Sequence, residues 1–217
     1  MPQSRRYKKK KSAGKAILAW IIVFAILAAA AFVFVSFFYE DAKKKLDEMN
    51  YPRTYSTYVE KAAKDYDLDP ALIYAVIHTE SGFDPKAESG VGAKGVMQMM
   101  PSSFEWLQEQ RGCAGQYTED DLFDPEICID YGSYLLKYFY DYFGTERSAI
   151  AAYNAGFVVS DWLNDTNYSS DGKNLDSIPY PETKNYVDKV ESAKEMYIKL
   201  YYCLLYTSPS PRDGLLS

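Results

Sequence analysis

The chain has 217 residues, with 30 Asp and Glu against 24 Lys and Arg, and a formal net charge of −6. Seven of the basic residues lie within the first 15 positions, so the remainder of the chain is strongly acidic. This balance argues against nucleic acid as a partner, because binding nucleic acid requires a basic surface.

The N-terminal segment has the pattern of a membrane anchor. A basic cluster, formed by Arg5, Arg6, Lys8 to Lys11 and Lys15, precedes an uncharged apolar run at residues 16–38. At a helical rise of about 1.5 Å per residue, this run can cross a hydrocarbon core of about 30 Å. The positive flank predicts a single-pass protein with its N-terminus in the cytoplasm and the rest of the chain outside. A cleaved signal peptide is the alternative, since small residues occupy positions 28–31, but the long apolar run favours an uncleaved anchor.

The rest of the chain is predicted to form one mainly α domain. Residues 39–52 form a charged stalk that ends at Pro52, and residues 53–202 form a domain of about 150 residues, a common size for a single core. Helices are predicted at residues 57–66, 70–81, 104–110, 125–143, 145–154 and 182–202, with Ser102 or Ser103 as the N-cap of the third. Short β segments are allowed only within residues 91–98.

The predicted helix at residues 70–81 contains an unusual carboxylate. Asp69 is a good N-cap, Pro70 suits the first helical position, and Gly82 marks the end of the helix. Glu80 lies on the same stripe as Ile73, Val76 and Ile77, where an apolar side chain is expected. Burial and the C-terminal end of the helix dipole both disfavour its charged form, so its pKa should be raised. A carboxylic acid of this kind can act as a general acid near neutral pH.

The cysteines and the histidine give weaker signals. Outside the cytoplasm, Cys113 and Cys128 could form a disulfide, or they could be two separate thiols, and both arrangements remain open. His78 has no cluster of Cys, Asp or Glu at ligand spacing around it, so no metal site is predicted. No cofactor is predicted either.

The C-terminal segment breaks the pattern of the domain. The helical periodicity stops at Tyr202, and a Pro- and Ser-rich stretch follows. The peptide at residues 203–213 resembles the translated read-through of a sequencing-library adapter. Residues 203–217 are therefore left out of the fold prediction.

Several polar residues lie in otherwise apolar or small-residue surroundings. They are Gln98 in the run from Gly95 to Pro101, Tyr153 and Asn154 in Ala151-Ala-Tyr-Asn-Ala-Gly156, and Glu182 at the start of the last helix. Taken singly, each is a common turn, core or first-turn residue. Together with Glu80-Ser81, and in this order, they form a specific set of four motifs.

This set resembles the catalytic domain of lytic transglycosylases of the soluble-lytic-transglycosylase type, over residues 55 to 200. The resemblance implies a lysozyme-like, mainly α fold with a groove that binds the glycan strand of peptidoglycan in the bacterial cell wall. Glu80 matches the catalytic acid of the family, and Ser81 would support the turn that follows it. The matching groove contacts are Ser89, Gln98, Met100, Tyr153, Asn154, Glu182 and Tyr186. Val96 replaces a more common Leu, which is a mild departure.

In this family, one carboxylic acid cleaves the bond between N-acetylmuramic acid and N-acetylglucosamine and yields a 1,6-anhydromuramic end. The nearest alternative is a goose-lysozyme-like hydrolase, in which Asp84, Glu88 or Glu182 would position a water. A glycan-binding scaffold without activity is the second alternative, and loss of the acid would be its signature. The resemblance thus predicts a peptidoglycan-cleaving enzyme in the bacterial cell membrane, with its catalytic domain outside.

Overall fold

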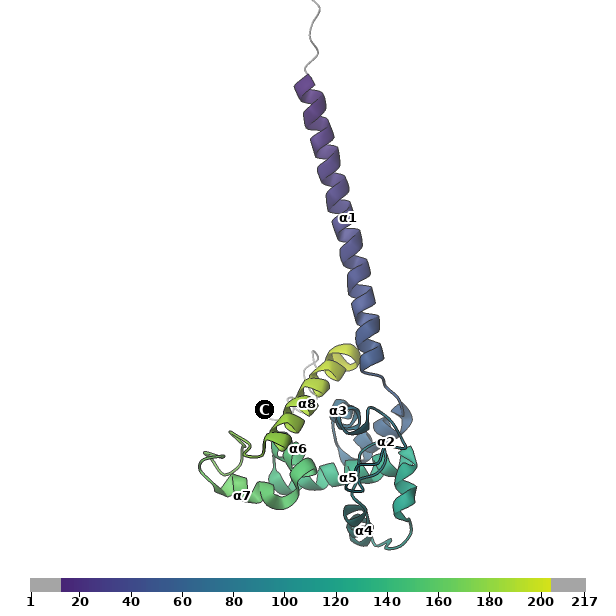
Figure 1. Cartoon of the computed structure of the whole chain (residues 1–217), viewed down its shortest axis with the longest axis vertical. Coiled ribbons are helices and arrows are strands. Elements are labelled where there is room, and N and C mark those ends of the chain that lie inside the picture. The colour runs from purple at the N-terminus through teal and green to yellow at the C-terminus, as the bar shows by residue number, and fades with distance from the viewer. Residues whose placement is uncertain (1–12, 204–217) are drawn as a thin grey trace, which may run out of the picture. The chain divides into compact units, whose positions relative to one another are not determined.

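The computed structural model describes residues 13–203 and divides the chain into two compact units, one up to Asn50 and one from Tyr51 onward. Most of the N-terminal basic cluster and residues 204–217 of the adapter-like segment lie outside the described residues. The regular elements are the helices α1 (Ala13–Asn50), α2 (Ser56–Tyr66), α3 (Pro70–Ser81), α4 (Pro101–Gln110), α5 (Pro125–Phe143), α6 (Glu146–Ala155), α7 (Val159–Asn164) and α8 (Pro181–Tyr197), the 3-10 helices η1 (Glu119–Phe123) and η2 (Gly156–Val158), and the π-helical turn η3 (Ile198–Tyr202) (Figure 1).

Helix α1 makes up the regular structure of the first unit. It continues without a break through the predicted stalk as far as Asn50. Its apolar side chains, from Ile17 to Phe38, are exposed. By length and composition, α1 is the one helix in the described part of the chain that could cross a membrane.

The second unit is built around α3. Every residue of α3 from Ala71 to Ile77 is buried. Helix α8 packs along α3 and also contacts α6, while α5 packs between α2 and α6 (Figure 1). The last turn of α3 is thus held by α8 from a distant part of the sequence, and that contact positions the candidate site.

The loop between α3 and α4 is held close to α5 by a glycine. Gly95 has a φ of 76°, in the left-handed region that favours glycine. A Cβ atom at this position would lie 2.0 Å from the carbonyl oxygen of Leu122 and 2.8 Å from the sulfur of Cys128. Any side chain at position 95 would therefore push the loop away from η1 and α5.

The structure corrects three details of the predicted elements. Helix α4 begins at Pro101 with Met100 at its N-cap, so neither Ser102 nor Ser103 caps it. Helix α7 and the two 3-10 helices were not predicted. In place of β segments, the described part of this loop has two isolated β-bridges, in which Lys94 pairs with Glu88 and with Met99.

Candidate active site

The end of α3 is fixed by local interactions that place Glu80 in the last turn. The Asp69 side chain accepts a hydrogen bond from the Ala71 amide at 2.9 Å, and Pro70 occupies the first helical position. Gly82 ends the helix with a φ of 60°, and its amide donates to the carbonyl oxygen of His78 at 3.1 Å. Glu80 therefore lies on the stripe predicted from the sequence, above a buried apolar face.

The Glu80 carboxylate has one polar partner among the described residues. The hydroxyl of Tyr186, in the second turn of α8, donates to Glu80 Oε1 at 2.7 Å. The other carboxylate oxygen, Oε2, has no hydrogen-bond partner within residues 13–203, and no cation pairs with the carboxylate there. Burial raises the pKa of Glu80 to about 7, although the hydrogen bond from Tyr186 opposes this rise.

The loop after α3 is tied to the same helix end. Ser81 Oγ donates to the carbonyl oxygen of Val96 at 2.8 Å and accepts from the Phe83 amide at 3.1 Å. The Tyr153 hydroxyl, from α6, donates to the carbonyl oxygen of Met97 at 2.9 Å. Helices α3 and α6 are thereby linked through one short stretch of loop.

Two tyrosines beside Glu80 remain neutral hydroxyl donors. Burial raises the pKa of Tyr153 and of Tyr186 well above the ordinary value, and the negative charge of Glu80 raises both further. The site therefore combines one carboxyl group, protonated for part of the time at neutral pH, with neutral hydrogen-bonding groups. This combination can transfer a proton to and from a polar, uncharged ligand.

The remaining residues of the predicted site do not bond to Glu80. Asn154 accepts a hydrogen bond from the hydroxyl of Thr183 at 2.8 Å, a contact between α6 and α8 that the sequence did not indicate. Gln98 turns its amide nitrogen back to the carbonyl oxygens of Ala87 and Gly95, both at 3.0 Å. These two contacts support helix packing and loop shape respectively.

Three other predicted contacts lie in loops or at helix starts. Ser89 Oγ accepts from the Ala93 amide at 2.9 Å and so closes a turn of the loop. Met100 is 39% exposed at the N-cap of α4, and Glu182 is exposed in the first turn of α8. The last two side chains are thus accessible to a ligand.

Cys113 and Cys128 are separate free thiols, as in the second of the two arrangements left open by the sequence. The sulfur of Cys113 lies 3.3 Å from the Tyr131 hydroxyl. Cys128 is buried under the loop and accepts a hydrogen bond from the Met97 amide at 3.4 Å. Burial raises the pKa of Cys128 to about 12, so its thiol stays neutral and inert.

His78 packs against an aromatic ring, with its centroid 4.8 Å from that of Tyr51. Burial lowers its pKa, so the ring is neutral at physiological pH. Within the described residues, no group of three or more His, Cys, Asp or Glu side chains is arranged to hold a metal ion.

Comparison with known proteins places this geometry in a family. Residues 57–175 match the family model of the transglycosylase SLT domain. This match covers more than half of the chain, and the chain belongs to that family. The mainly α, lysozyme-like fold predicted from the sequence is confirmed by the structure and by the solved structures it matches.

Two curated relatives illustrate the similarity. The soluble lytic murein transglycosylase of Escherichia coli is 33% identical over 146 residues, which cover 66% of this chain and 23% of that protein. The membrane-bound lytic murein transglycosylase C of Actinobacillus succinogenes is 30% identical over 167 residues, which cover 67% of this chain and 47% of that protein. The chain therefore matches between about a quarter and a half of the length of these relatives.

Two solved structures share the fold. The 70-kDa soluble lytic transglycosylase of Escherichia coli matches with a TM-score of 0.63 and 28% identity, over 70% of this chain and 25% of that one. An inactive glutamate-to-glutamine mutant of the lytic transglycosylase Slt from Pseudomonas aeruginosa matches with a TM-score of 0.62 and 30% identity, over 76% of this chain and 26% of that one.

Proposed function

We propose that this protein is a membrane-anchored lytic transglycosylase that cleaves the glycan strand of peptidoglycan. The observation that carries the proposal is Glu80, a partly buried carboxylic acid with a pKa raised to about 7. Membership of the SLT family and the names of the relatives support the same activity and substrate. The inactive glutamate-to-glutamine mutant of the Pseudomonas relative supports a glutamate as the essential group.

In the first step, the protonated Glu80 donates its proton to the oxygen that links N-acetylmuramic acid to N-acetylglucosamine. The C1–O bond breaks, and N-acetylglucosamine leaves with a free hydroxyl. Since Tyr186 occupies Oε1, Oε2 is the oxygen with room for the proton and for the substrate. A pKa of about 7 keeps a useful fraction of this acid protonated at neutral pH.

In the second step, the Glu80 carboxylate takes the proton from the C6 hydroxyl of the same muramic acid. The C6 oxygen bonds to C1 and closes a 1,6-anhydro ring, so no water is consumed. Glu80 is protonated again and ready for another turnover. A single group that alternates between acid and base needs a pKa near the working pH, as Glu80 has.

The other predicted residues have supporting roles in this proposal. Ser81 supports the end of α3, while Tyr153 and Tyr186 hold the surroundings of Glu80 and offer neutral hydroxyls. The exposed Met100 and Glu182 contact the glycan. The glycan also contacts Ser89, Gln98 and Asn154, through the side-chain atoms that do not take part in their internal hydrogen bonds.

A hydrolase that uses water requires a second group beside Glu80 to hold that water. Asp84, Glu88 and Glu182, the three candidates, are exposed, and none makes a hydrogen bond to Glu80 in the described structure. No other carboxylate contributes to the raised pKa of Glu80. This arrangement favours the C6 hydroxyl over water as the group that attacks C1.

The test is mass spectrometry of the fragments that the detergent-solubilised full chain releases from purified peptidoglycan. The proposal predicts muropeptides with a 1,6-anhydro end, each lighter by one water than the reducing form. Reducing ends alone would identify a hydrolase, and binding without cleavage would identify a scaffold. Glu80→Gln should abolish product formation, and a variant with full activity would refute the assignment.

We also propose how the chain is divided and oriented. Residues 1–15 form the cytoplasmic tail, residues 16–38 the anchor, residues 39–52 the stalk and residues 53–202 the catalytic domain. The positive flank of the apolar run supports a cytoplasmic N-terminus. Protease treatment of intact spheroplasts should therefore digest residues 53–202, and full protection of this domain would contradict the orientation.

A further inference from the structure

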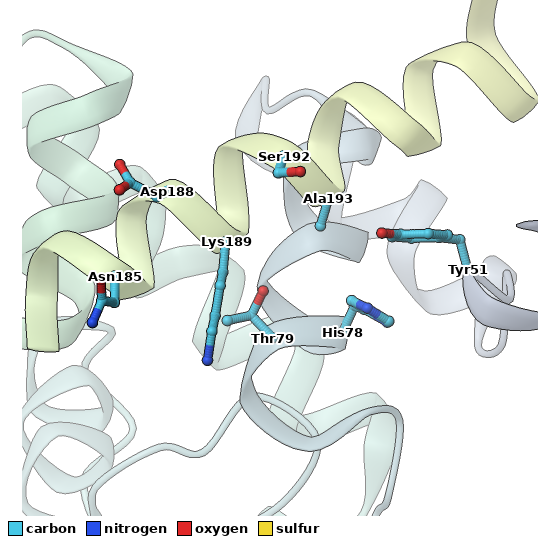
Figure 2. Close-up of a pocket in the computed structure, with 8 residues that line it drawn as sticks. All are labelled: Tyr51, His78, Thr79, Asn185, Asp188, Lys189, Ser192 and Ala193. Carbon is cyan, nitrogen blue, oxygen red and sulfur yellow. The ribbon is translucent and has the colours of Figure 1, made fainter.

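A polar hollow lies on the seam between α3 and α8, next to the candidate active site. It has a volume of about 650 Å³, and its lining includes Tyr51, His78, Thr79, Asn185, Lys189 and Ser192 (Figure 2). Glu80 does not line it. The hollow is therefore a separate space.

Two of the lining residues are the immediate neighbours of the candidate catalytic pair. Thr79 precedes Glu80 on α3, and Asn185 precedes Tyr186 on α8. Since the Tyr186 hydroxyl bonds to Glu80 at 2.7 Å, the two helices meet at that pair. The hollow thus lies on the same two helices, one residue along each from the contact between Glu80 and Tyr186.

Four polar side chains of the hollow have no partner among the described residues. Within the described range, no side-chain hydrogen bond or ion pair involves Thr79, Asn185, Lys189 or Ser192. The Lys189 amine extends from α8 toward Thr79 (Figure 2). On the other side, the ring of His78 packs on that of Tyr51 and forms a flat wall. The hollow thus combines a free cation, neutral hydrogen-bonding groups and an aromatic wall.

The one acidic residue that lines the hollow does not neutralise this cation. The Asp188 carboxylate points away from the Lys189 amine, to the other side of α8 (Figure 2). It pairs with Lys184 at 2.6 Å and lies 3.9 Å from Arg147. The Lys189 amine is therefore a positive charge in the hollow without a counter-charge among the described residues. Its chemistry suits a ligand with a carboxylate and several amide groups.

We propose that this hollow binds the peptide attached to the muramic acid at which Glu80 acts, with Lys189 pairing with a peptide carboxylate. This inference rests on the proposed function, which places peptidoglycan at Glu80. The glycan strand itself has no free carboxylate, because the lactyl group of each muramic acid carries the peptide. The peptide supplies free carboxylates and amides, which match Lys189 and the hydrogen-bonding groups of Thr79, Asn185 and Ser192.

The test compares two substrates and two matched variants of the full chain. The substrates are peptidoglycan with its peptides and the same glycan after an amidase has removed them, which leaves only a short lactyl carboxylate on each muramic acid. Lys189→Gln removes the charge in the hollow, and Lys64→Gln removes the charge of an exposed lysine in α2. Lys189→Gln should lower kcat/KM about 5- to 10-fold on the peptide-bearing substrate, mainly through KM, and leave cleavage of the bare glycan unchanged.

Lys64→Gln should cleave both substrates like the wild type. An equal loss on the two substrates, or no loss on either, would overturn the peptide site. If the wild type cleaves neither substrate, the proposed function fails, and a binding measurement still decides the inference. A soluble muramyl peptide should bind Glu80→Gln about 5- to 10-fold more tightly than it binds the double variant Glu80→Gln/Lys189→Gln, and equal affinities would refute the site.

Discussion

Two polar clusters in the second unit differ in how their charge is balanced. Arg111 is half-buried between the rings of Tyr131 and Tyr134, at 4.0 and 4.3 Å from their centroids. Its guanidinium pairs with Asp130 at 2.6 Å, and the hydroxyl of Tyr66 bonds to both. Glu80 is also partly buried, yet it has a hydrogen bond from Tyr186 and no cation among the described residues.

The difference separates a structural cluster from a reactive one. A charge with an opposite partner keeps its charged form, and removing that partner destabilises the fold. A buried carboxylate without a cationic partner has its pKa raised toward neutrality. This shift lowers the free energy of unfolding at neutral pH. Substitutions in the Arg111 cluster should therefore lower stability, while substitutions at Glu80 should lower activity.

The largest expected effect is on activity at Glu80. Glu80→Gln keeps the shape of the side chain but removes the proton donor, so the rate of peptidoglycan cleavage should fall by about 1000-fold or more. Glu105→Gln, at an exposed position of α4, is the matched control and should retain wild-type activity. A loss below about 10-fold in Glu80→Gln would contradict a role as the acid.

The same substitution should increase stability, with a defined dependence on pH. Between the ordinary value of 4.5 and about 7, the unfolded chain releases the proton of Glu80 while the folded chain keeps it. The wild type therefore loses stability as the pH rises through this window, by up to about 3 kcal/mol at 1.36 kcal/mol per pKa unit.

Glu80→Gln has no such loss. Its free energy of unfolding should equal that of the wild type below about pH 4.5 and exceed it above about pH 7. Denaturant unfolding at a series of pH values measures the difference. A constant difference across the series would show that the pKa is not shifted.

In the Arg111 cluster the expected effect is on stability alone. Asp130→Asn leaves the guanidinium half-buried without its counter-charge, and the free energy of unfolding should fall by about 2 kcal/mol. Cleavage activity per folded molecule should remain within about twofold of the wild type, which a denaturation curve and a rate measurement on the same sample can check. A larger loss of activity would show that the Arg111 cluster also supports the active site.

The smallest effect is expected at Tyr186. Its hydroxyl stabilises the charged form of Glu80, so Tyr186→Phe should raise the pKa of Glu80 further. The decline of activity on the alkaline side should move to higher pH by about half a unit to one unit, with a rate about 10-fold lower at the optimum. Tyr180→Phe removes the hydroxyl of a 51% exposed tyrosine and should leave both the pH profile and the rate at the optimum unchanged. A shift to lower pH in Tyr186→Phe would contradict this role.

The sequence predicted the features that depend on local chemistry. The N-cap of α3 at Asp69, its first residue Pro70 and its end at Gly82 all follow from rules that act within a few residues, and the structure has all three. The N-cap of α4 was wrong because two serines next to Pro101 suggested a cap, whereas proline is favoured at the first position of a helix. Helix α7 is only six residues long and buries Trp162 by tertiary packing, which no short pattern indicates.

The site was only partly accessible from the sequence. The stripe of α3 indicated Glu80, but its contact with Tyr186 joins residues 106 positions apart. The family resemblance suggested Tyr186 only as a groove contact and not as the partner of Glu80. Gln98 was expected to face the ligand, yet its amide nitrogen bonds to the backbone of its own loop. The hollow at Lys189 was missed because its residues are ordinary surface residues when taken one by one, and only the packing of α3 on α8 brings them together.

The proposed mechanism depends above all on the protonation state of Glu80. The most direct measurement is a pH titration of the glutamate side-chain carboxyl carbons by nuclear magnetic resonance, with Glu80→Gln used to assign the resonance. The proposed mechanism predicts that the Glu80 signal titrates with a pKa near 7. A Glu80 resonance that titrates near the ordinary glutamate value of 4.5 would contradict the central claim that this carboxyl group is partly protonated at neutral pH.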